Sequence, residues 1–167
     1  MEPGSIIGLM LKTLELVHKW REGRLEKSEA KELYSRIFCA LLWEVYQNFD
    51  RCKVIVNQHR RGVISAGILS FFVRESLFPD FCIMCPEPRV IANLNEIYSA
   101  FERIHHWQRV TVDLPSRGAQ FIIGFAEDLF STKHLDQKYN LLLEGLKGLS
   151  SEIELPPKVE PPNNSIE

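Results

Sequence analysis

Apolar side chains recur along residues 30–61 at the three- and four-residue spacing of an amphipathic helix. The main row consists of Leu33, Ile37, Leu41, Val45 and Phe49. No proline or glycine interrupts this segment, so the pattern predicts one long helix with a buried stripe. The polar residues within it that have plausible functional roles, Glu44, Asn48 and Arg51, are interpreted as solvated positions.

The same spacing predicts shorter helices over residues 5–22, 88–107 and 115–130, and a last one with apolar residues from position 135 to 153. Ser131 or Thr132 is expected to cap the last helix, because their hydroxyls can accept a hydrogen bond from its first turn. Residues 79–88 contain three prolines and are predicted to form a loop.

Residues 63–78 are apolar on nearly every side until Arg74, and periodicity does not distinguish a buried helix from a strand here. Valine, isoleucine and phenylalanine favour a strand. However, the rest of the sequence offers no partner strand, and a lone strand leaves its backbone groups without hydrogen bonds. We therefore expect a central helix in this segment.

These elements predict an all-α fold: a single-domain antiparallel helical bundle of about six helices around the long one. The bundle is assigned to residues 1–155. From residue 156 the sequence is rich in proline and almost without apolar residues, so residues 156–167 are predicted to be an extended or disordered tail in solvent.

Composition limits the function classes. The chain of 167 residues has 20 Lys and Arg against 22 Asp and Glu, a net charge of -2, so no nucleic-acid partner is expected. No apolar stretch reaches the ~18–20 residues of a membrane helix, so no membrane partner is expected either. Four cysteines without a secretory signal indicate reduced thiols and a cytoplasmic protein.

Cys82 and Cys85 form a Cys-x-x-Cys pair before a predicted helix. Two such thiols can bind one Zn²⁺, and His105 and His106 could complete the four ligands. The pair could also form a redox disulfide, although the βαβ pattern of thioredoxin-like proteins is absent. In the third interpretation the two cysteines are small apolar residues that fill the core.

Two Glu-x-x-His motifs offer a second metal hypothesis. Glu15 with His18, and Glu102 with His105, place a carboxylate and an imidazole on one helix face. This spacing is similar to that of carboxylate-bridged di-iron bundles, in which two other helices each supply a further glutamate. The further ligands here would be Glu44 and Glu127, but the order of motifs along the chain differs from the ferritin-like order.

No Gly-x-Ser-x-Gly elbow, cysteine-histidine signature or phosphate-binding glycine loop occurs in the sequence. We therefore expect a protein that is not an enzyme. The favoured function is a helical interaction protein, an adaptor or a subunit of a larger assembly, with a protein partner or as a homo-oligomer. The alternative is a metal-binding helical protein that holds zinc or iron.

Overall fold

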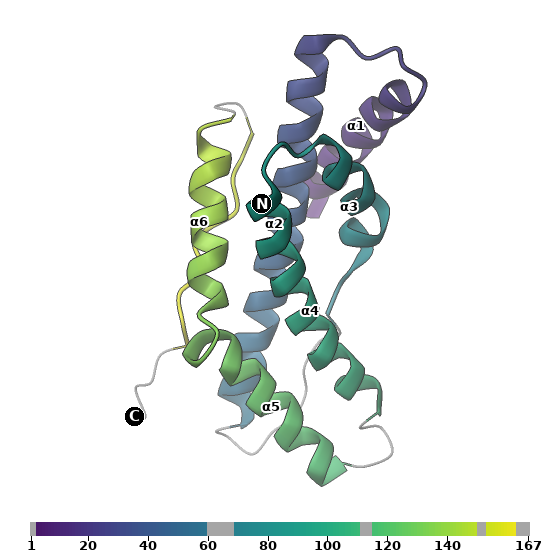
Figure 1. The fold of residues 1–167 in the computed structure, drawn as a ribbon. Coiled ribbons are helices and arrows are strands. Elements are labelled where there is room, and N and C mark those ends of the chain that lie inside the picture. The colour runs from purple at the N-terminus through teal and green to yellow at the C-terminus, as the bar shows by residue number, and fades with distance from the viewer. Residues whose placement is uncertain (1–2, 60–68, 111–114, 150–152, 163–167) are drawn as a thin grey trace.

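The computed structural model describes residues 3–59, 69–110, 115–149 and 153–162, which form six helices and no strand. The helices are α1 (Pro3–Arg21), α2 (Lys27–His59), α3 (Phe72–Met84), α4 (Pro88–Val110), α5 (Pro115–Ser131) and α6 (Leu135–Lys147). Helix α2 contacts each of the other five (Figure 1). The prediction of an all-α fold around a long helix is confirmed. None of the described helices combines the length and apolar character that crossing a membrane requires.

The predicted apolar stripe of α2 forms the centre of the core. Its five main residues, Leu33, Ile37, Leu41, Val45 and Phe49, are all fully buried. The ring of Phe49 contacts three other helices, because its centroid lies 5.1 Å from Phe101, 5.7 Å from Phe130 and 5.9 Å from Tyr139. Burying one such aromatic side chain contributes about 1.5–3 kcal/mol to the free energy of unfolding. The ring of Phe49 therefore stabilises the packing of α2 on α4, α5 and α6.

The helix predicted over residues 63–78 is confirmed for residues 72–78 and wrong for residues 69–71. Residues 69–71 are not helical, and α3 begins at Phe72 and continues through Pro79, where a loop was expected. Residues 63–68 lie outside the described residues. Pro79 is tolerated because Glu75, whose carbonyl loses its helical hydrogen bond, lies on an exposed side of α3 together with the proline. On the opposite side Leu77 and Phe81 are fully buried, and their burial outweighs the lost bond.

The predicted cap of the last helix is also wrong. Ser131 donates its hydroxyl hydrogen bond to the carbonyl of Glu127, and Thr132 donates to the carboxylate of Asp128, so both side chains complete the end of α5. Helix α6 begins only after His134, which adopts the left-handed conformation (φ 49°) and makes no side-chain cap. The chain reverses at this backbone position, which sequence periodicity does not reveal.

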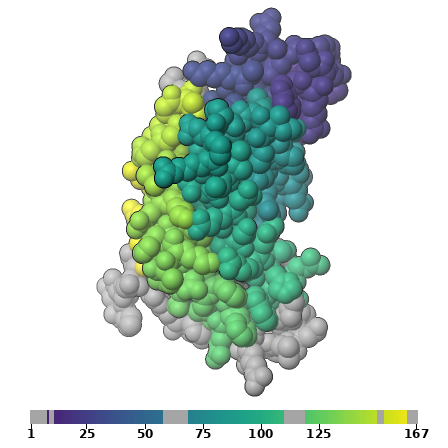
Figure 2. Space-filling view, in the orientation of Figure 1, coloured from purple at the N-terminus to yellow at the C-terminus, as the bar shows by residue number. Residues whose placement is uncertain are grey.

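Residues 153–162 run back along α6 as an extended segment, and in Figure 2 they emerge at its edge. Residues 156–162 are thus extended, one of the two states expected, but they are packed on the bundle and not surrounded by solvent. Pro156 and Val159 are buried, Val159 to 2% exposure. The assignment of residues 1–155 as a separate bundle domain stays a prediction.

Candidate functional site

The structure does not bring the predicted zinc ligands together. Cys82 lies in the last turn of α3 and Cys85 directly after it, with the Cys85 Sγ 3.5 Å from the Tyr34 hydroxyl of α2. His105 and His106 lie in the second half of α4, a helix of 23 residues that starts close to Cys85. At 1.5 Å per residue, roughly 25 Å of helix separates the histidines from the cysteines.

The residues of the second metal hypothesis are also dispersed. Glu15 and His18 are exposed on α1, and Glu127 is exposed on α5. Glu44 is buried and bonded to backbone groups, and Glu102 forms an ion pair with an arginine of α3. Within the part of the chain that the structure describes, no group of three or more His, Cys, Asp or Glu side chains is arranged to hold a metal ion. Binding of zinc or iron stays a prediction.

The interpretation of Glu44 as a solvated residue is wrong, because its side chain is only 3% exposed. One carboxylate oxygen accepts a hydrogen bond from the Val73 amide at 2.8 Å. The other accepts from the Arg74 amide at 3.0 Å and from the Tyr98 hydroxyl at 3.1 Å. Burial raises the pKa of Glu44 above its usual 4.5, although these hydrogen bonds oppose the shift. Glu44 thus caps α3 from the core.

Asn48 is likewise fully buried and was wrongly interpreted as solvated. Its Nδ2 donates to the Ser70 carbonyl at 2.7 Å, and its Oδ1 accepts from the Ser70 amide at 2.9 Å. The side chain therefore satisfies both backbone groups of a non-helical residue, which would otherwise be costly to bury. The sequence did hold a signal: Leu41, Glu44, Val45 and Asn48 follow the i, i+3, i+4, i+7 spacing of one helix face.

Side chains of α2 and α6 make several hydrogen bonds to extended backbone between these two helices. We call the surface formed by Cys39, Trp43, Tyr139 and Asn140 the peptide groove, because residues 153–162 lie against it. On the α2 side, the Trp43 indole donates to the Glu154 carbonyl at 3.2 Å. The Cys39 thiol donates to the same carbonyl at 3.5 Å.

The α6 side of the peptide groove holds the segment further along. The Tyr139 hydroxyl donates to the Pro157 carbonyl at 3.0 Å. Asn140 donates from Nδ2 to the Val159 carbonyl and accepts from the Val159 amide, both at 2.9 Å. An amide side chain that pairs with both backbone groups of one residue fixes an extended chain independently of that residue's side chain. The groove is a site for backbone recognition.

An ion pair adds a side-chain contact at the same place. The Lys158 ammonium lies 3.0 Å from the Glu144 carboxylate of α6, and both side chains are about half exposed. The pKa of Glu144 is lowered by its hydrogen bonds with Lys158 and Lys147. Exposed pairs of this kind contribute little affinity but favour one register of binding.

No known protein family matches the sequence, and comparison with curated proteins and with solved structures gives no match either. The functional assignment therefore depends on the contacts made by this chain.

Proposed function

We propose that the protein is a non-enzymatic helical interaction protein, an adaptor or subunit, whose peptide groove binds an extended, proline-containing segment of a protein partner. The observation that carries the proposal is the pairing of Asn140 with both backbone groups of Val159. Residues 153–162 then act as the groove's occupant in the absence of the partner. A partner segment of similar chemistry replaces them.

The contacts define the chemistry that the groove selects. Three backbone carbonyls, those of Glu154, Pro157 and Val159, accept hydrogen bonds from groove side chains. Proline has no amide hydrogen, so a groove that reads carbonyls accepts proline-rich backbone without loss. Two side chains, Pro156 and Val159, point into buried surroundings. The partner segment is therefore expected to carry two apolar residues three positions apart, the first of them a proline.

We place this interaction in the cytoplasm, which four unpaired cysteines favour. A second copy of the chain is the other occupant to consider, because identical segments can exchange between protomers. We favour a different protein, since the segment follows α6 closely and already reaches the groove of its own chain.

The test uses full-length protein with Val159→Asp, because a charge at this buried position displaces the segment while the groove residues stay intact. A fluorescent peptide with the sequence of residues 153–162 is then titrated and followed by anisotropy. We expect saturable binding that is at least about tenfold weaker when Asn140→Ala is added, since two hydrogen bonds are lost. Gln137→Ala, at an exposed position of α6, is the matched control and is expected to leave affinity unchanged.

Absence of saturable binding to the Val159→Asp protein would overturn the proposal, as would equal affinity with and without Asn140. Size-exclusion chromatography of the unmodified protein separates the two occupants. A dimer that becomes a monomer on Val159→Asp would assign the groove to a second copy and not to a different protein.

A further inference from the structure

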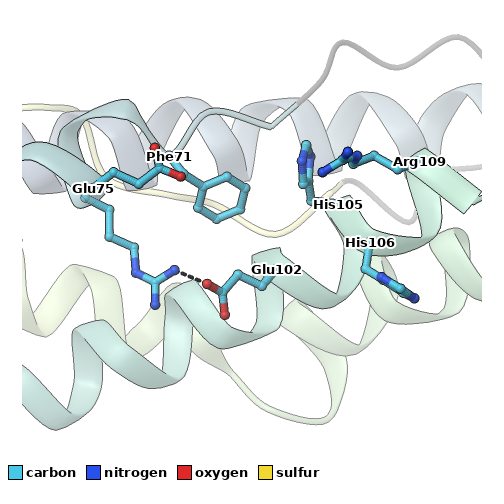
Figure 3. A pocket seen from close by; sticks show the side chains of 7 residues that line it. Phe71, Glu75, Glu102, His105, His106 and Arg109 are labelled. Carbon is cyan, nitrogen blue, oxygen red and sulfur yellow. Dashed lines mark hydrogen bonds and ion pairs between the residues drawn. The ribbon is translucent and has the colours of Figure 1, made fainter.

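A second concave site lies on another part of the bundle, between the start of α3 and the last turns of α4. This pocket has a volume of about 550 Å³, within the ~300–1,000 Å³ typical of sites for small molecules. We call it the α3–α4 pocket. Its wall combines the ring of Phe71 with charged side chains, among them Arg74, Glu102, His105 and Arg109 (Figure 3).

The charges in the α3–α4 pocket are separated in space. The Arg74 guanidinium is neutralised by its ion pair with Glu102 and lies 5.2 Å from the centre of the Tyr98 ring. Arg109, in contrast, has no ion-pair partner among the described residues. Figure 3 shows the Arg109 guanidinium on the side of His105 and the Glu75 side chain extending toward Phe71. The side of the pocket that carries Arg109 is therefore basic.

His105 carries the clearest sign of a missing partner. Its Nδ1 atom is buried and makes no hydrogen bond with any described residue. The imidazole packs edge-on against Phe71, with ring centroids 5.3 Å apart and an interplanar angle of 65°. Native proteins leave few buried polar atoms unpaired, because each one loses its hydrogen bond to water. Because Nδ1 has almost no accessible surface, a ligand in the pocket reaches it only when the imidazole ring turns, and the hydrogen bond gained would favour that turn.

We propose that the α3–α4 pocket binds a phosphate monoester with an apolar or aromatic body. The phosphate oxygens accept hydrogen bonds from the Arg109 guanidinium and, once the imidazole has turned toward the pocket, from His105 Nδ1, in the imidazole form that carries a proton there. The apolar part of the ligand contacts the ring of Phe71. Arginine suits this role because its planar set of donors matches a phosphate in charge and geometry. The volume of the pocket exceeds that of a lone phosphate ion, which is why an organic ester is assigned.

Phenyl phosphate is the probe, titrated into the full-length protein by isothermal calorimetry. We expect saturable binding, with inorganic phosphate weaker because it lacks the ring and phenol weaker because it lacks the charge. Arg109→Met is expected to reduce the affinity at least about tenfold, the ratio for loss of a charge-assisted hydrogen bond. His105→Phe, which keeps an aromatic ring but removes the donor, is expected to reduce it too.

Arg103→Met is the matched control, since Arg103 is an exposed arginine of α4 that bonds to the Ser99 carbonyl outside the pocket. The Arg103→Met protein is expected to bind phenyl phosphate with the affinity of the unmodified protein. An equal loss in the Arg103 and Arg109 variants would indicate general attraction of anions and overturn the assignment. Lack of saturation, or equal affinity for phenyl phosphate and inorganic phosphate, would overturn it as well. Arg109 is exposed, so its replacement leaves the core intact.

Discussion

The carboxylate of Glu44 accepts a hydrogen bond from the backbone amide of Val73 at 2.8 Å, so a side chain in the middle of α2 caps a different helix. The residue before α3, Phe71, offers no side-chain cap of its own. The first amides of a helix have no partner within it, and here the long-range acceptor replaces the local one. The position of α3 therefore depends on α2.

Replacing Glu44 with alanine is expected to lower the free energy of unfolding by about 2–4 kcal/mol. The change leaves the Val73 and Arg74 amides without their carboxylate acceptor, and Tyr98 keeps only its bond to the Leu41 carbonyl. Each unpaired donor is costly. Urea denaturation followed by circular dichroism measures the change. Glu32→Ala, on the same helix at a half-exposed ion pair with Arg36, is the control and should cost less than about 0.5 kcal/mol. Equal effects of the two changes would contradict the structural role of Glu44.

Glu44 is also expected to make stability depend on pH. Its pKa is raised in the folded state above the usual 4.5, so between these two values the folded protein binds more protons than the unfolded chain. The free energy of unfolding contributed by this group is therefore full below about pH 4.5. It falls as the pH rises through the raised pKa.

Glu44→Gln removes this titration while keeping one acceptor for the amides of α3. Unfolding curves measured at a series of pH values from 4 upward should show a smaller loss of stability with rising pH in the variant than in the unmodified protein. Because the other carboxylates are common to both proteins, the difference between the two profiles isolates Glu44. Parallel profiles would show that the pKa of Glu44 is not raised.

The four cysteines are expected to react with iodoacetamide at two different rates. Cys39 and Cys52 are fully buried, and burial raises the pKa of Cys39 to about 12 and that of Cys52 further. The thiolate is the reactive form, so both should resist iodoacetamide in the folded protein. Cys82 and Cys85 are partly exposed and should be alkylated first. Mass spectrometry of peptides after timed labelling gives the rates.

Full labelling of all four cysteines in denaturant is the control for the reagent. Rapid labelling of Cys39 in the folded protein would indicate that residues 153–162 leave the peptide groove often, since its thiol bonds to the Glu154 carbonyl. Repeating the labelling with added Zn²⁺ tests the zinc prediction, because a bound metal would protect Cys82 and Cys85 alone.

The sequence predicted the helices whose apolar periodicity is strong. The buried row from Leu33 to Phe49 is an example, since five residues at regular spacing allow one orientation only. It did not predict the roles of Glu44 and Asn48, because a polar residue is normally assigned to solvent. Their partners lie 22 to 54 residues away in the sequence, which local pattern does not reveal.

Two further errors have the same origin. A proline ends most helices, but α3 continues through Pro79. Burial of Leu77 and Phe81 stabilises the helix by more than the missing backbone hydrogen bond costs. The prediction that the C-terminal segment lies in solvent was based on its composition alone. Its prolines do not form a core of their own, yet Asn140 and Tyr139 of α6 provide donors for their carbonyls and for the neighbouring backbone.

The bond between Trp43 and Glu154 joins positions 111 residues apart and thereby imposes an order of events on folding. A chain made from its N-terminus presents α2 long before it presents residues 153–162. The Cys39 and Trp43 donors of the groove are therefore present before the segment that follows α6 has been made. Contacts of such long sequence separation form late because a large loop must close first. During that interval a partner protein can bind the peptide groove before the chain's own segment does.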